Sequence, residues 1–305
     1  MLLTRQMLNE LRGVLLPITT PFSSELVDHS ALRLNLDRWS TTGIRGFVVL
    51  GSTGERVHLD EREYLDVIET TRAAVPRTGD AMAFIVGAGQ ESVAGTTNEI
   101  KRAAERGADG VLVITPHYYR AAITQDTLIS YYTAVADASP VPVLLYSMPA
   151  LTGIKIEPET IARLSEHENI IGVKDSSNDL DGFAETVRLC PSDFAVQTGN
   201  GTVFLDALRA GATGAILAVG CVVPEICVAI HKAFNNGEEQ RASDLQAKLT
   251  PLATAVTTKY GIGGLKAALD LAGYKGGAVR APLRAPGETA RVEIARLLAD
   301  AKAAG

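Results

Sequence analysis

Short apolar runs recur along the chain, and each is followed by a segment with helical spacing. The runs are rich in Val, Ile and Leu, which is typical of buried strands. They occupy residues 13–19, 46–51, 82–89, 110–115, 142–147, 170–175, 194–199 and 214–220. Between them, apolar residues return every three or four positions, which predicts helices over 60–75, 92–106, 124–139 and 179–190.

The predicted strands are apolar throughout instead of alternating, which favours a parallel sheet covered by helices on both faces. Eight strand–helix units on one chain predict a (β/α)8 TIM barrel. The chain then continues with more helical pattern than the eighth unit needs. We therefore predict a barrel over 1–237 and a helical C-terminal extension over 238–305, packed together as one structural unit.

In such barrels the chemistry lies at the C-terminal ends of the strands and in the loops that follow them. The candidate residues are therefore those that come directly after each apolar run. They are Thr20, 51–55, Gly89, 116–119, 146–147, 174–176, 199–201 and Ala218.

Lys174 ends the sixth predicted strand, in the sequence IIGVKDSS. An amine with apolar neighbours is more readily neutral, and a neutral amine attacks carbonyl groups. The alternative is a strand-end lysine paired with Asp175 or another carboxylate. No other lysine ends a predicted barrel strand, which favours a functional role.

Two further loops carry hydroxyl groups toward the same end of the barrel. GSTGE at 51–55 lets the backbone approach a ligand closely, and Ser52 and Thr53 offer donors to a carboxylate, although a simple tight turn would explain it too. Tyr146 ends the fifth strand, where its hydroxyl would shuttle protons beside an amine or would merely pack in the barrel. Tyr118 and Tyr119 follow the fourth strand and suit an interface or a lid equally well.

Glycine-rich loops leave a different class of enzyme open. GAGQES at 87–92 opens a helix like a dinucleotide fingerprint, but the third glycine of that fingerprint is missing before Val93. The glycines after strands seven and eight would suit a phosphate. The rival interpretation is thus a phosphosugar isomerase or a cofactor-binding oxidoreductase on the same barrel.

Composition excludes several partners. The net charge is -6 and there is no basic stripe, which argues against nucleic acid. No apolar run is long enough to span a membrane, and we expect no secretory signal. Three cysteines give no disulfide framework, so we predict a cytoplasmic protein. The five histidines are scattered, so we expect no metal site.

Several motifs together resemble one family. They are GSTGE at 51–55, Y-x-x-P-x-x-T-G at 146–153, IIGVKDS at 170–176, YGIGGLKAALDLAGYKGG at 260–277 and RAPL at 280–283. The chain resembles, over about its whole length, the dihydrodipicolinate synthase and N-acetylneuraminate lyase superfamily of class I aldolases.

The resemblance implies a mechanism without metal or external cofactor. Lys174 would form a covalent imine with pyruvate, or with a 2-oxo acid that contains it. Tyr146 would relay the proton, helped by Thr53 and by Tyr119 from a neighbouring subunit. Ser52 and Thr53 would hold the pyruvate carboxylate, and the Ile216 carbonyl would line the pocket. A homotetramer, built as a dimer of dimers, is expected on the same ground.

The resemblance leaves the second substrate open. In synthase members an arginine that binds the aldehyde carboxylate stands where this chain has Leu151, and losing that clamp argues against the synthase. Sialic acid lyases place acidic residues where this chain has 199–201. The best regional match is the 4-hydroxy-2-oxoglutarate aldolase branch, with Ser147 and Ser176 shaping the pocket.

We therefore expect cleavage of a 4-hydroxy-2-oxo acid to pyruvate and an aldehyde. The alternatives are dihydrodipicolinate synthase, which condenses pyruvate with aspartate semialdehyde, and a 2-keto-3-deoxy sugar acid aldolase. A non-catalytic 2-oxo acid sensor is a fourth possibility.

Overall fold

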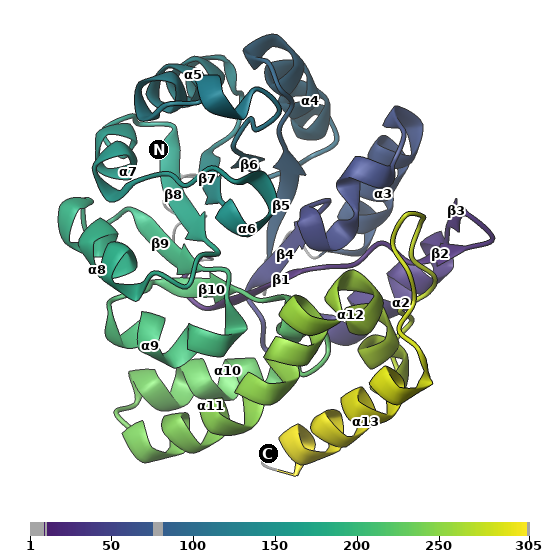
Figure 1. Ribbon diagram of the computed structural model, residues 1–305. Helices are drawn as coiled ribbons and strands as arrows, with labels where there is room; N and C mark the ends of the chain where they lie inside the picture. The colour runs from purple at the N-terminus through teal and green to yellow at the C-terminus, as the bar shows by residue number, and fades with distance from the viewer. Residues whose placement is uncertain (1–8, 10, 76–81, 304–305) are drawn as a thin grey trace.

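The structure is a computed structural model that describes residues 9, 11–75 and 82–303. Eight parallel strands close into a barrel, and each strand pairs with its neighbours in the chain (Figure 1). These strands are β1 (Val14–Pro17), β4 (Gly46–Val49), β5 (Ala83–Ala88), β6 (Gly110–Ile114), β7 (Val143–Ser147), β8 (Ile170–Asp175), β9 (Ala195–Thr198) and β10 (Gly214–Ile216). The predicted (β/α)8 barrel is confirmed.

Helices surround the barrel (Figure 1). They are α2 (His29–Trp39), α3 (Glu61–Ala74), α4 (Val93–Glu105), α5 (Gln125–Ala138), α6 (Pro149–Thr152), α7 (Pro158–Leu164), α8 (Leu180–Leu189), α9 (Phe204–Arg209) and α10 (Pro224–Asn235). Each of the four helices predicted by spacing begins one residue late, because the first predicted residue is its N-cap. Asp60, Ser92, Thr124 and Asp179 each accept a hydrogen bond from a backbone N–H of the first turn.

The C-terminal region is helical and packs on the barrel. It contains α11 (Glu239–Thr254), a π-helical turn (Ala255–Lys259), α12 (Gly261–Leu271) and α13 (Glu288–Lys302). One hydrophobic cluster joins Leu16 of β1 and Leu36 of α2 to Leu249, Leu265 and Ile294 of these helices. The boundary that we place at residue 237 remains a proposal.

The fold differs from the prediction in two places. A small antiparallel pair, β2 (Phe22–Ser23) and β3 (Leu26–Val27), follows β1. Its turn residues Ser24 and Glu25 have positive φ angles, and sequence reasoning missed the turn because it lacks the usual Asn-Gly signal. The eighth strand also ends at Ile216, because Ala218–Cys221 turns into a 3₁₀-helix.

Alternation along the strands divides the core into an interior and an outer layer. The interior cluster fills the barrel with Leu11, Leu15, Val48, Ala83, Ile85, Leu112, Leu144, Tyr146, Ile171, Ala195 and Ile216. Neighbouring strand residues such as Phe47 and Val173 face outward and pack in clusters with helical residues. Burial on both faces explains why the strands are apolar throughout. Within the described ranges, no helix is both long and apolar enough to cross a membrane.

Arg280 fastens the C-terminal segment to α3. Its guanidinium bonds both carboxylate oxygens of Glu63, one of them at 2.6 Å, and donates to the His58 carbonyl at 2.8 Å. The hydrogen bonds from Arg280 hold the pKa of Glu63 below its usual value. Glu63 also completes a capping box with Asp60 at the start of α3.

This pair makes stability depend on pH. Glu63→Gln keeps the capping hydrogen bond but removes the charge, so we expect it to lower the free energy of unfolding by about 1 kcal/mol at neutral pH. A lowered folded-state pKa gives stability that is present above the ordinary pKa and is lost as the pH falls through the folded one. Denaturant unfolding over a pH series should therefore show the two proteins converging in acid. A difference that stays constant with pH would contradict this account.

Candidate active site

Lys174 and Tyr146 lie side by side at the C-terminal rim of the barrel. They are register partners on the parallel strands β8 and β7, so their side chains share one face of the sheet. Tyr146 packs in the interior cluster, which places that face inside the barrel. The Lys174 Nζ lies 4.5 Å from the centre of the Tyr146 ring, and both residues are buried.

Lys174 does not form the ion pair with Asp175 that the alternative interpretation required. Asp175 points to the other face of the sheet, where its carboxylate accepts a hydrogen bond from the Ser177 amide at 2.7 Å. Burial raises the pKa of Asp175. Across the described part of the chain, no hydrogen bond or ion pair engages the Lys174 amine. A buried amine without a carboxylate is costly, which points to a chemical use.

Gly199, directly after β9, makes room for the lysine. A Cβ atom built on Gly199 would lie 2.7 Å from the Lys174 Cε, and it would overlap the Ser176 hydroxyl. The glycine therefore leaves the space that the Lys174 and Ser176 side chains fill.

The loop after β4 supplies the neighbouring hydroxyl groups. Ser52 and Thr53 form a short 3₁₀ turn with Gly54, and the Ser52 hydroxyl lies 3.4 Å from the Tyr146 hydroxyl. Leu50 and Glu55 on either side of this turn have φ angles of 60° and 54°. Two non-glycine residues in the left-handed region store about 1 to 3 kcal/mol of strain each, and such strain gathers at functional sites.

The structure places the other predicted site residues unequally. Ile216 is buried at the end of β10 in the interior cluster, and Ser176 lies beside Gly199. Ser147 follows Tyr146, so alternation turns it to the opposite face, where its hydroxyl accepts from the Ile156 amide at 3.3 Å. The structure thus does not bring the Ser147 hydroxyl to the lysine.

Three predicted or candidate residues lie in solvent. Leu151 on α6 is 60% exposed. Tyr119 is 71% exposed and lies against the ring of Tyr118, with ring centres 5.1 Å apart. Exposed rings of this kind are typical of surfaces that a partner covers.

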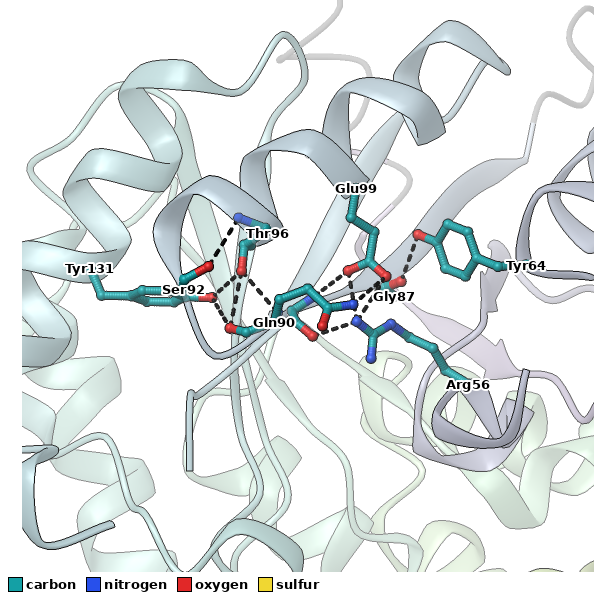
Figure 2. Close-up of polar contacts among 10 residues, drawn as sticks. Arg56, Tyr64, Gly87, Gln90, Ser92, Thr96, Glu99 and Tyr131 are labelled. Carbon is teal, nitrogen blue, oxygen red and sulfur yellow. Dashed lines mark hydrogen bonds and ion pairs between the residues drawn. The ribbon is translucent and has the colours of Figure 1, made fainter. Parts of the chain in front are cut away.

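Sequence reasoning missed a buried network beside the site, which Figure 2 shows. Arg56 bonds both carboxylate oxygens of Glu99, at 2.8 and 2.7 Å, and donates to the Gly89 carbonyl. Glu99 in turn accepts from the Gly89 amide at 2.8 Å and from the Gln90 side chain at 3.3 Å. These contacts occupy backbone groups of the GAGQES loop that a dinucleotide phosphate would need, which disfavours the cofactor-binding alternative. Both residues sit on helical turns with no motif that signals the pairing.

The cysteines and the possible metal ligands of the described residues are not gathered at this site. Cys221 and Cys227 are buried and free, and burial raises the pKa of Cys227 to about 12. No group of three or more His, Cys, Asp or Glu residues within 9, 11–75 and 82–303 is arranged to hold a metal ion.

A parallel barrel with a buried, unpaired strand-end lysine beside a tyrosine is the architecture of a Schiff-base aldolase. Comparison with known proteins agrees with this class. The chain belongs to the dihydrodipicolinate synthetase family, whose model matches residues 10–301. The family consists of pyruvate-dependent class I aldolases and lyases, so the chain is an enzyme of that kind.

The relatives are similar over nearly the whole chain. The 4-hydroxy-tetrahydrodipicolinate synthase of Syntrophus aciditrophicus is 35% identical, covering 94% of this chain and 97% of its own. Dihydrodipicolinate synthase from Thermotoga maritima has a TM-score of 0.91 at 30% identity, covering 95% and 98%. A prophage protein of the same family from E. coli K12, solved in complex with pyruvate, has a TM-score of 0.88 at 27% identity, covering 95% and 98%.

These comparisons give the 4-hydroxy-2-oxoglutarate aldolase branch no specific support. The relatives carry the name of the synthase, the alternative that Leu151 had made less attractive.

The gap at Gly199 gives a direct test of the site. Gly199→Ala would push a methyl group against Lys174 and Ser176, so we expect a loss of activity on pyruvate on the order of a hundredfold, as for a misplacement of about 1 Å. Melting temperature and pyruvate-dependent turnover should be measured together. Gly287→Ala, before α13 and outside the site, is the control, because a Cβ there meets nothing within 4 Å. Full activity in Gly199→Ala would show that the lysine position is not critical.

Proposed function

We propose that the protein condenses pyruvate with an aldehyde that carries a carboxylate, as in the 4-hydroxy-tetrahydrodipicolinate synthase reaction with aspartate semialdehyde. The observation that carries the proposal is the buried amine of Lys174, unpaired within the described residues, over the Tyr146 ring. The identity of 31 to 35% with two relatives of that name supports the choice of reaction.

Each step of the proposed reaction balances without a metal or an external cofactor. The Lys174 nitrogen attacks C2 of pyruvate, and loss of water gives the imine, with Tyr146 carrying the proton to the departing oxygen. The protonated imine makes C3 acidic, and Tyr146, which has given up its proton, takes one from C3 to leave an enamine. C3 then bonds to the aldehyde carbon, and the aldehyde oxygen takes up a proton. Attack on the imine carbon by water, or by an amine of the product, frees Lys174.

The loop hydroxyls have separate proposed tasks. Ser52 and Thr53 hold the pyruvate carboxylate at the short turn after β4. Thr53 also joins the proton relay with Tyr146, and Tyr119 completes that relay from a neighbouring subunit. The Ile216 carbonyl and Ser176 line the pocket, whereas Ser147 supports the adjoining segment through Ile156.

The aldehyde carboxylate needs a cation, and Leu151 does not supply one. Arg120 lies against the same turn: a Cβ atom built on Gly153 would be 2.9 Å from the Arg120 Nε. Arg120 is exposed, and within the described residues no ion pair engages it. We propose that Arg120 replaces the missing clamp, since a guanidinium recognises carboxylates through paired hydrogen bonds.

A second candidate is cleavage of a 4-hydroxy-2-oxo acid, such as 4-hydroxy-2-oxoglutarate, to pyruvate and an aldehyde. Its aldehyde half also carries a carboxylate, so the exposed Leu151 does not distinguish it from the synthase reaction. The aldehyde half of a 2-keto-3-deoxy sugar acid carries hydroxyl groups instead, so it needs no cation at this position. Both reactions use the same imine, so only the aldehyde half distinguishes them.

We also propose a cytoplasmic homotetramer, built as a dimer of dimers. The exposed rings of Tyr118 and Tyr119 support an assembly in which a second copy covers this rim. Light scattering on the active protein tests the assembly, and a fully active monomer would contradict it.

The reaction is tested by assaying condensation and cleavage on the same protein preparation. With pyruvate and aspartate semialdehyde, we expect pyruvate to disappear faster than 4-hydroxy-2-oxoglutarate releases it. Lys174→Ala should abolish both activities, because each passes through the imine. Faster cleavage would establish the second candidate, and full activity in Lys174→Ala would refute the mechanism.

Arg120 is tested by its effect on one substrate only. Arg120→Gln should lower kcat/KM for the carboxylate-bearing aldehyde by about tenfold to a hundredfold, the value of a charged hydrogen bond, and leave the KM for pyruvate unchanged. Arg163→Gln, which removes an exposed arginine from α7, is the control. An equal loss of kcat/KM with an uncharged aldehyde would show that Arg120 does not bind the carboxylate.

A further inference from the structure

Glu55 and Arg56 are adjacent in the chain, carry opposite charges and are held by two different parts of the molecule. The Glu55 carboxylate lies 2.5 Å from the amine of Lys266, and the side chains are 1% and 2% exposed. Arg56 pairs with Glu99, with side chains 13% and 7% exposed. The loop that carries Ser52 and Thr53 therefore ends in two ion pairs, one fully buried and the other partly buried.

Lys266 connects this loop to the C-terminal region and to the segment after β1. It lies on α12, and its amine donates to the carbonyls of Thr20 at 2.8 Å and Ala278 at 2.5 Å. The same amine lies 4.4 Å from the centre of the Phe22 ring. The Glu55 carboxylate is the ionic partner of this amine, in addition to the two carbonyls that accept its hydrogen bonds.

Arg56 connects the other end of the loop to the next strand. Glu99 lies on α4 and also accepts the Gly89 amide after β5. Arg56 donates to the Gly89 carbonyl from the same side. Arg56 and Glu99 thus fix the loop after β4 against the loop after β5.

The loop needs such external support. Its 3₁₀ turn covers only Ser52–Gly54, and the strained residues Leu50 and Glu55 flank it. The Thr20 hydroxyl donates to the Gly54 carbonyl at 2.7 Å, and the Ser52 hydroxyl lies 3.4 Å from that of Tyr146. These two contacts bear on the turn itself. Strained backbone persists only where the surroundings hold it in place.

We infer that the Glu55–Lys266 and Arg56–Glu99 pairs are positioning groups, which hold Ser52 and Thr53 in the geometry that binds the carboxylate of pyruvate. The inference rests on the proposed function of this loop. None of the four residues acts on the substrate; each acts through the backbone of the turn. The C-terminal helix α12 thereby contributes to pyruvate binding without reaching the pocket.

The test compares the KM for pyruvate with kcat in single and double variants. Glu55→Gln and Glu99→Gln should each raise the KM for pyruvate on the order of tenfold to a hundredfold, because a misplacement of about 1 Å costs that much. The turnover at saturating pyruvate should fall much less. Glu55→Gln with Lys266→Met should be less than additive, because removing one partner alone leaves a buried charge unpaired.

The control is a pair in the same C-terminal region that does not touch the loop. Lys259 and Glu293 are paired at 2.7 Å, with side chains 51% and 32% exposed. Glu293→Gln should leave both the KM and kcat unchanged. All assays should be run well below the melting temperature of each variant, so that unfolding does not enter the KM.

A conservative variant keeps the inference testable if the glutamine variants do not fold. Arg56→Lys retains the charge but replaces the planar guanidinium, whose one nitrogen bonds both Glu99 oxygens and the Gly89 carbonyl, by a shorter side chain. It should therefore raise the KM for pyruvate in a folded protein. A wild-type protein that forms no imine with pyruvate would overturn the proposed function. A wild type that forms the imine, with folded variants of unchanged KM, would overturn only this inference.

Discussion

The in-register pairing of β7 with β8 is the constraint on which the site depends. Because parallel partners project to the same face, the Tyr146–Lys174 register places an amine and a phenol together inside the barrel. Closure of the barrel then surrounds them with the ends of the other strands. Gly199 on β9's loop and the Ser52 turn on β4's loop complete the same rim.

Two buried lysines, Lys266 and Lys174, differ in whether a carboxylate balances the charge of the amine. Lys266 is 1% exposed and is paired with Glu55 and two backbone carbonyls, as a structural charge must be. Lys174 is 5% exposed, and the described residues offer it no carboxylate. Burying the Lys174 amine therefore costs free energy that an ion pair offsets at Lys266. We connect that cost to the proposed nucleophilic attack of Lys174 on pyruvate.

Local pattern was enough to predict the barrel and the position of Lys174. The strands are buried on both faces, so each reads as an apolar run, and the residue after it marks the catalytic rim. The period of two would also have separated Ser147 from Tyr146, because consecutive residues face opposite sides. The hairpin at 22–27 was not predicted, because Ser24 and Glu25 adopt positive φ angles that their residue types do not favour.

The supporting shell could not be predicted, because its pairs join distant segments. Nothing in GSTGER indicates that its glutamate meets Lys266 while its arginine meets Glu99. Likewise, the approach of Arg120 to Gly153 depends on how two loops lie over one another. Such contacts follow from the three-dimensional arrangement of segments that lie far apart in the sequence.

The central claim is that Lys174 is the nucleophile, and trapping the imine tests it most directly. The protein is mixed with pyruvate, borohydride is added, and the modified peptide is located by mass spectrometry. The account predicts a stable adduct on Lys174, and none on Lys266, which is also buried. A folded protein that gives no adduct, or an adduct on another lysine, would contradict it.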